Sequence, residues 1–229
     1  MPVWGFLITK DNLTLKNLNS LNDLVWGNPC KEDVENISHA TYLDDLLPSF
    51  MNNVQPPLNT SQEAIAELYD LMELQKRRQI SRKSLFDKML VPVIVDLYAR
   101  NGVQPEPVQK LGDDIVQDIL PVITKLKYHY NRPRPNQLAY YHGLDLNPDF
   151  SNWVSSPSYP SGHATLCMVM GHVLRNAYPQ SFDVMHNFMR EVLWSRLEMG
   201  VHYESDNVAA KILSEQIVIH DQFKTKYHI

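Results

Sequence analysis

Apolar residues recur at spacings of three and four along much of the chain after residue 60, which is the period of a helix with one buried face. Alternation of the kind that predicts strands is scarce. We therefore expect an all-α fold with helices over about 61–74, 81–100, 107–130, 162–177, 182–198 and 205–219. Pro92 is expected to kink the second helix, and Pro121 lies inside the third. Residues 133–160 contain five prolines and little periodicity, so they are predicted to form a long ordered loop.

The composition supports one domain with a real core. Of the 229 residues, 44% are apolar and 21% are charged, which excludes wholesale disorder. We expect a single all-α domain over 1–229, a helical bundle on which residues 1–60 pack as an N-terminal extension. Cys30 and Cys167 are too few for a disulfide framework.

Charge and hydropathy restrict the partners and the location. The net charge of −5 argues against a nucleic-acid partner, and no apolar run reaches the roughly 18 residues of a membrane span. The first ten residues lack the early positive charge and the unbroken apolar stretch of a signal peptide. We therefore expect a cytoplasmic protein, or a periplasmic one if a leader has been removed.

Three of the predicted helices each place a charged residue on an apolar stripe. The stripe of Val116, Leu120 and Ile123 continues to Lys127. The stripe of Met185, Met189 and Val192 continues to Arg196. The stripe of Ala209, Leu213 and Ile217 begins at Asp206. A buried lone charge is costly, so these groups are expected to be paired or to face a polar pocket. One interpretation is a structural ion pair of Asp206 with Arg196 or Lys127. Two cations and one carboxylate leave a positive excess, however, which favours a site for a small anion.

A further segment fits such a site. Tyr159-Pro160-Ser161-Gly162-His163 precedes an almost wholly apolar helix. The backbone N–H groups and the positive dipole end at such a helix start can hold phosphate. The alternative is that the Ser161 hydroxyl only caps the helix, which needs no ligand.

Three segments resemble, in order and spacing, the motifs of the type 2 phosphatidic acid phosphatase (PAP2) superfamily, which includes the vanadium-dependent haloperoxidases. They are Lys127 to Pro135 (a lysine, six residues, then Arg-Pro), Pro160-Ser161-Gly162-His163, and Ser195-Arg196 followed by His202 and Asp206. Their surroundings are most similar to the soluble bacterial class A non-specific acid phosphatases. The resemblance covers residues 120–215, the expected catalytic region. Lys125 with Arg132 fits the first motif equally well, but the apolar stripe favours Lys127 with Arg134.

The resemblance also implies a role for each residue. His202 would be the catalytic nucleophile, Asp206 would fix its tautomer, and His163 would be the general acid and then the base. The implied phosphate-binding residues are Lys127, Arg134, Ser161, Gly162 and Arg196. Arg132 and Tyr159 are expected either at the entrance or behind the binding residues. Because a bound anion raises the pKa of His163, an acidic to near-neutral optimum is expected.

The resemblance thus implies a metal-independent phosphatase that hydrolyses small soluble phosphate esters through a phosphohistidine. It implies no cofactor and no metal ligand, and vanadate is an expected inhibitor. One alternative is a vanadium-dependent haloperoxidase, in which vanadate is the cofactor at the same anion site. Another is a diphosphatase or phosphotransferase with a narrow intracellular substrate. The expected partner is a small phosphate ester, and the family suggests a homodimer.

Overall fold

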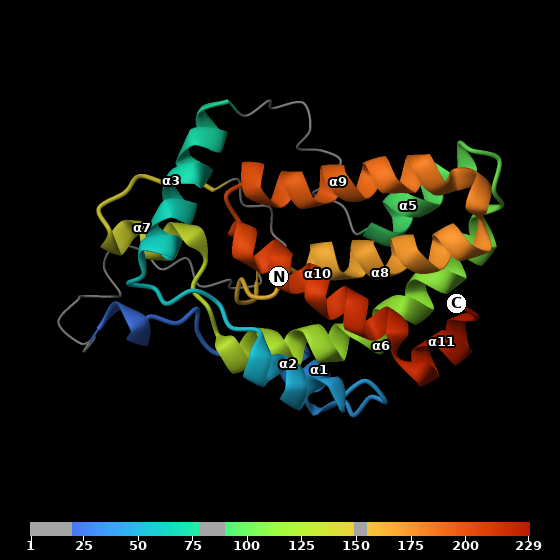
Figure 1. Ribbon diagram of the computed structural model, residues 1–229, viewed down its shortest axis with the longest axis horizontal. Helices are drawn as coiled ribbons and strands as arrows, with labels where there is room; N and C mark the ends of the chain where they lie inside the picture. Colours follow the sequence, from blue (N-terminus) through green and yellow to red (C-terminus); the bar gives the residue numbers. More distant parts are fainter. Residues whose placement is uncertain (1–19, 78–89, 149–154) are drawn as a thin grey trace.

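The computed structural model describes residues 20–77, 90–148 and 155–229, and the regular elements in these ranges are all helical (Figure 1). The all-α prediction is therefore confirmed for the described part of the chain. The elements are η2 (Leu21–Asp23), α1 (Lys31–Ser38), α2 (Leu46–Asn53), α3 (Gln62–Lys76), α5 (Leu90–Ala99), α6 (Pro105–Tyr130), α7 (Pro135–Tyr141), α8 (Gly162–Ala177), η4 (Pro179–Ser181), α9 (Phe182–Glu198), α10 (Glu204–Ile219) and α11 (Asp221–Tyr227).

Helix α8 packs against α6, α9 and α10, and α5 packs against α6. The C-terminal ends of α6 and α9 and the N-terminal ends of α8 and α10 point toward the same end of the bundle, at the left of Figure 1. Helices α3 and α7 lie at that end as well. The three sequence motifs sit on these helix ends and on the segments that join them, so the fold brings the motifs together.

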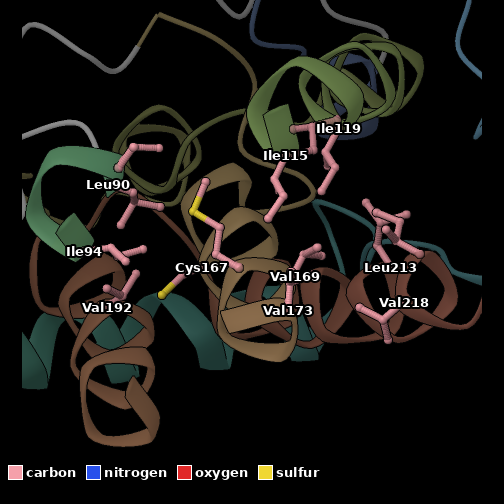
Figure 2. Close-up of a cluster of buried hydrophobic side chains, with 14 of the residues drawn as sticks. Leu90, Ile94, Ile115, Ile119, Cys167, Val169, Val173, Val192, Leu213 and Val218 are labelled. Atoms are coloured by element: carbon pink, nitrogen blue, oxygen red, sulfur yellow. The ribbon is translucent and has the colours of Figure 1, made fainter. Parts of the chain in front are cut away.

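Buried apolar side chains from five helices form a core that holds these helices together (Figure 2). The labelled members are Leu90 and Ile94 of α5, Ile115 and Ile119 of α6, Cys167, Val169 and Val173 of α8, Val192 of α9, and Leu213 and Val218 of α10. Each is at most 9% exposed. Full burial of one such aliphatic side chain contributes about 1.5–3 kcal/mol, so this core can support charged groups at its end.

Most predicted helix bounds agree with the structure. Helices α8, α9 and α10 begin and end within one residue of the predicted positions, and α6 begins two residues earlier than predicted. Helix α3 follows Ser61, whose hydroxyl accepts a hydrogen bond from the Ala64 N–H at 3.1 Å. The described part of the predicted helix 81–100 is α5, and residues 81–89 lie outside the described ranges.

The prediction of a continuous loop over 133–160 is wrong, because this segment contains helix α7. Pro135 occupies the first helical position, where a missing N–H costs nothing. The Gln137 side chain accepts a hydrogen bond from the Arg134 N–H at 2.7 Å, and Leu138 is buried. Residues 149–154 lie outside the described ranges.

Segments near both ends of the described chain pack on the bundle. Helices α1 and α2 pack against α6, and α11 packs against α10. The Asp118 carboxylate of α6 accepts hydrogen bonds from the hydroxyls of Tyr42 and Tyr227, at 2.7 and 2.8 Å, and from Lys226 Nζ at 2.7 Å. Within the described ranges, no helix is both long enough and apolar enough to cross a bilayer.

Candidate active site

Hydrogen bonds to the backbone join the three motifs into one site. The Arg134 Nη1 donates to the Val201 carbonyl at 2.7 Å, which links the residue before α7 to the segment before α10. The Ser161 N–H donates to the Asp206 carbonyl at 3.1 Å, which links the residue before α8 to the first turn of α10. Each motif is therefore positioned by bonds to another as well as by its own helix.

His202 lies in the turn between α9 and α10 and is held through both ring nitrogens. Nδ1 lies 2.9 Å from Asp206 Oδ2, and Nε2 lies 3.0 Å from Arg134 Nη1. Because a guanidinium can only donate, Nε2 must accept and carries a lone pair, while Nδ1–H donates to Asp206. His202 is therefore neutral. The turn before it depends on Gly200, whose φ of +66° lies in the left-handed region that favours glycine.

Three buried cations, Lys127, Arg134 and Arg196, give the site its positive charge. Burial and the charges of Arg134, Lys127 and Arg196 lower the pKa of His202 well below its usual range. Burial, followed by the Arg134 charge, lowers the pKa of Lys127, and burial lowers the pKa of Arg134 to about 10. Cations that depress one another's pKa values in this way are stabilised by an anion placed between them.

The structure places Lys127 inside the protein and Lys125 on its outer side. Lys127 is 6% exposed, and its Nζ donates to the Pro157 carbonyl. Lys125 Nζ instead forms an ion pair with Asp44 at 2.6 Å. The two lysines are only two positions apart, so the helical period separates them although both fit the motif spacing.

The start of α8 adds neutral donors beside the cations. Ser161 is the N-cap residue, but its hydroxyl makes no capping hydrogen bond, and its buried Oγ has no partner among the described residues. The interpretation of Ser161 as a simple cap is therefore wrong. A Cβ added to Gly162 would lie 3.5 Å from Lys127 Cε, so this helix start touches the lysine side chain. Buried hydroxyls without an acceptor are rare, and this one is suited to donate to a bound anion.

His163, the next residue of α8, is partly exposed. Although part of the residue stays exposed, desolvation of the ring by the surrounding protein, followed by the charge of Arg196, lowers the pKa of His163 well below the usual range. Without a bound anion both His163 and His202 are thus neutral near pH 7. A dianion in the site would oppose the cations and raise the pKa of His163.

Arg132 and Tyr159 are both buried, which argues against the entrance position considered for them. The Arg132 side chain is 2% exposed, and its guanidinium lies 3.7 Å from the centroid of the Tyr203 ring. Tyr159 is 1% exposed and packs edge-on against Tyr130.

One partner of the Asp206 carboxylate, His202, is the expected one, and the other, Arg132, is not. Asp206 Oδ1 accepts a hydrogen bond from Arg132 at 2.7 Å, and Asp206 Oδ2 accepts one from His202 at 2.9 Å. The structural ion pair of Asp206 with Arg196 or Lys127 is therefore wrong. The carboxylate is fully buried, so its charge acts on Arg132 and His202 with little screening by water.

Sequence reasoning missed Glu67 of α3, which contacts the site from the side. Its Oε2 lies 3.0 Å from Arg132 Nη2, and its Oε1 accepts a hydrogen bond from the Ser205 N–H at 2.6 Å. A signal was present, because Glu67 lies three residues after Ala64 and four before Leu71, two buried residues of the same helix face. A charged residue on an apolar stripe therefore marks α3 as it marks the other three helices.

Acidification is expected to destabilise the anion-free protein. The pKa values of His202 and His163 are lowered in the folded state, so the unfolded state, with pKa values of about 6.5, binds more protons. Above about pH 6.5 these two histidines do not lower the free energy of unfolding. Below about pH 6.5, each of them lowers it by up to about 1.4 kcal/mol per pH unit.

Urea unfolding in phosphate-free buffer at a series of pH values measures this slope. His202→Gln should flatten it, while His129→Gln, which replaces an exposed histidine of α6, should leave it unchanged. Equal slopes in the wild type and His202→Gln would contradict the expectation.

The sequence-predicted catalytic and phosphate-binding residues all lie at one end of the bundle. They provide a neutral histidine with a fixed tautomer, three cations, a helix start with a buried hydroxyl, and a second histidine. Among the described residues, no group of three or more His, Cys, Asp or Glu side chains could hold a metal ion. Residues 115–220, which contain this whole set, match the family model of the PAP2 superfamily, which includes phosphatases.

Proposed function

We propose that the protein is a metal-independent phosphatase that hydrolyses small phosphate monoesters through a phosphohistidine on His202. One observation carries the proposal. The lone pair of His202 Nε2 is directed into the cluster of cations, 3.0 Å from Arg134, while Asp206 holds the Nδ1–H. A nucleophile with a fixed tautomer, beside groups that neutralise a phosphoryl dianion, meets the needs of phosphoryl transfer to nitrogen.

In the first step the phosphoryl oxygens take up the donors of the three cations, the Ser161 hydroxyl and the start of α8. The phosphate replaces His202 as a partner of Arg134, which frees Nε2 to attack phosphorus. The bond from phosphorus to the ester oxygen breaks, and His163 gives its proton to the departing alcohol. Asp206 stabilises the positive charge that develops on the His202 ring.

In the second step His163, now neutral, accepts a proton from a water molecule that attacks the phosphohistidine. The bond between phosphorus and Nε2 breaks, which releases phosphate and restores neutral His202. Because the pKa of His163 is low until an anion is present, the bound substrate itself supplies the condition for its protonation. This coupling favours an acidic to near-neutral optimum.

Hydrolysis of p-nitrophenyl phosphate from acidic to weakly alkaline pH tests the proposal. We expect turnover that EDTA does not change and that orthovanadate, which mimics the five-coordinate phosphorus, inhibits. Activity that EDTA abolishes would contradict the metal-independent mechanism. Peroxide-dependent halide oxidation by the vanadate-loaded protein, without ester hydrolysis, would contradict the phosphatase and support a haloperoxidase.

Ser161→Ala is expected to weaken catalysis without lowering stability. Its buried hydroxyl has no partner in the anion-free site, whereas hydrogen bonds to charged groups are worth about 1.5–3 kcal/mol. We therefore expect kcat/KM to fall by about tenfold to a hundredfold. The free energy of unfolding in phosphate-free buffer should be unchanged or slightly higher.

Ser61→Ala is the matched control, because the Ser61 hydroxyl does cap a helix, at 3.1 Å from the Ala64 nitrogen. It should lose about 1 kcal/mol of stability and keep the activity. If Ser161→Ala instead lost stability and kept kcat/KM, the assignment of this hydroxyl to phosphate would be wrong.

A further inference from the structure

Helix α3 supplies a carboxylate that reaches the site from outside the segment matched by the family model. The Glu67 side chain is 11% exposed. Its Oε1 accepts a hydrogen bond from the Ser205 N–H at 2.6 Å, and its Oε2 accepts one from the Ser205 hydroxyl at 2.9 Å. Oε2 also accepts one from Arg132 Nη2 at 3.0 Å. Glu67 therefore ties α3 both to the first turn of α10 and to the segment after α6.

Arg132 is shared between two carboxylates. While Nη2 donates to Glu67, Nη1 donates to Asp206 Oδ1 and to the Ser205 hydroxyl, both at 2.7 Å. The guanidinium is planar and rigid, so holding one of its nitrogens sets the direction of the other. The Tyr203 ring covers the guanidinium, which leaves it little freedom to turn. The position of Asp206 is thus linked to Glu67 through a buried, rigid group.

We propose that Glu67 is a positioning residue for the nucleophile: it holds Arg132, which holds Asp206, which holds His202. This inference rests on the proposed phosphatase function. Glu67 contacts neither His202 nor the phosphate-binding cations, and it acts through Arg132. With two carboxylates to share, Arg132 leaves part of the Asp206 charge for the His202 Nδ1–H. Without Glu67, Arg132 interacts with Asp206 alone and weakens the Asp206–His202 bond.

The loss of the Glu67 carboxylate should change the pKa of His202 in a direction that can be measured. The charged and titratable groups that face His202 are Asp206 of α10, Lys127 of α6, Arg196 of α9, His163 of α8, and Arg132 and Arg134 between α6 and α7. Removing one negative charge beside this mainly cationic set disfavours the imidazolium, and so does a weaker bond to Asp206. Both effects lower the pKa of His202. Since His202 reacts as the neutral ring, the acid limb of the pH profile should move to lower pH.

Glu67→Gln tests the proposal, because glutamine keeps the size of the side chain and removes its charge. We expect kcat to fall by about tenfold to a hundredfold, the loss seen when outer partners of metal-bound histidines are removed. KM should stay within about twofold, since the phosphate-binding groups are intact. The acid limb of kcat/KM should move to lower pH. Glu67→Asp should keep the limb near its wild-type position, and Asp70→Asn, an exposed residue of the same helix, should change neither.

If the wild type is active, either of two results would overturn the proposal. One is Glu67→Gln with wild-type kcat and an unmoved acid limb. The other is a loss of activity that only follows the loss of folded protein, which would mean a structural role. If Glu67→Gln does not fold, Ser205→Ala removes one bond of the same link and should move the limb less in the same direction, and an unmoved limb in that variant would overturn the proposal.

A measurement that does not depend on turnover tests the positioning role of Glu67 separately from the proposed phosphatase function. The Nδ1–H proton resonance of His202, identified by its absence in His202→Gln, should move upfield in Glu67→Gln and stay in place in Asp70→Asn. A wild type that hydrolyses no ester would refute the proposed function, and the resonance would still report whether Glu67 supports the Asp206–His202 bond. An unmoved resonance would overturn the positioning role.

Discussion

His202→Ala is expected to lower kcat/KM for a phosphate monoester by about ten-thousandfold or more, the scale of loss when an enzyme's nucleophile is removed. Among the residues that the structure describes, no other group at the site offers a lone pair in the same place, because Nε2 is the atom directed at the cations. The cations and the start of α8 remain in the variant. We therefore expect it to bind orthophosphate or orthovanadate while it fails to turn over, so that binding and chemistry separate.

Calorimetry measures vanadate binding, and p-nitrophenyl phosphate kinetics measure turnover, on the same sample. His129→Ala, in which an exposed histidine of α6 is replaced, should match the wild type in both. Substantial turnover by folded His202→Ala would show that another residue is the nucleophile. A variant that had also lost vanadate binding would show that His202 helps to build the anion site and would leave the separation unsupported.

The apolar stripes of the helices carry most of the information about the site that the sequence contains. A charge in an apolar stripe is costly to bury, so the helical period alone is enough to single out Lys127, Arg196 and Asp206. The same reasoning applied to α3 identifies Glu67. Arg132 follows the end of α6, where no helical period applies, and its pairing with Asp206 therefore becomes visible only in three dimensions.

Short elements and loop geometry are the parts that sequence reasoning does not reach. The segment of helix α7 is predicted as loop because prolines usually break helices, although Pro135 stands at the one helical position that favours proline. Helices α1, α2 and α11 have only seven or eight residues each, too few for a period to appear. Their contacts with α6 and α10 stabilise them, and such contacts join residues that are distant in the chain.

Asp206→Asn is expected to damage both stability and catalysis, because the Asp206 carboxylate serves Arg132 and His202 at once. Its Oδ1 accepts from Arg132 at 2.7 Å, and its Oδ2 accepts from His202 Nδ1 at 2.9 Å and from the Tyr203 N–H at 3.1 Å. An amide has only one acceptor oxygen, so Arg132 or His202 must face an N–H group instead. Breaking a buried ion pair in this way costs about 3–5 kcal/mol, and we expect a loss near the lower end because Glu67 still pairs with Arg132.

The catalytic loss should be larger than any effect of stability alone. With an amide in place of the carboxylate, the His202 proton is free to move to Nε2, which removes the nucleophilic lone pair from the cation cluster. The charge that stabilises the imidazolium is lost as well, and kcat should fall by about a thousandfold or more in the folded variant.

Asp118→Asn is the matched comparison, because the Asp118 carboxylate also accepts several hydrogen bonds, from Tyr42, Tyr227 and Lys226, but lies outside the site. It should lose stability and keep kcat when measured well below its unfolding temperature. Asp206→Asn should lose both, and thermal unfolding with kinetics at the same temperature separates the two variants. A folded Asp206→Asn protein with wild-type kcat would show that the tautomer of His202 is held by something other than this carboxylate. In that case the link from Glu67 through Arg132 would have no route to the nucleophile, so this one variant tests the last step of both proposals.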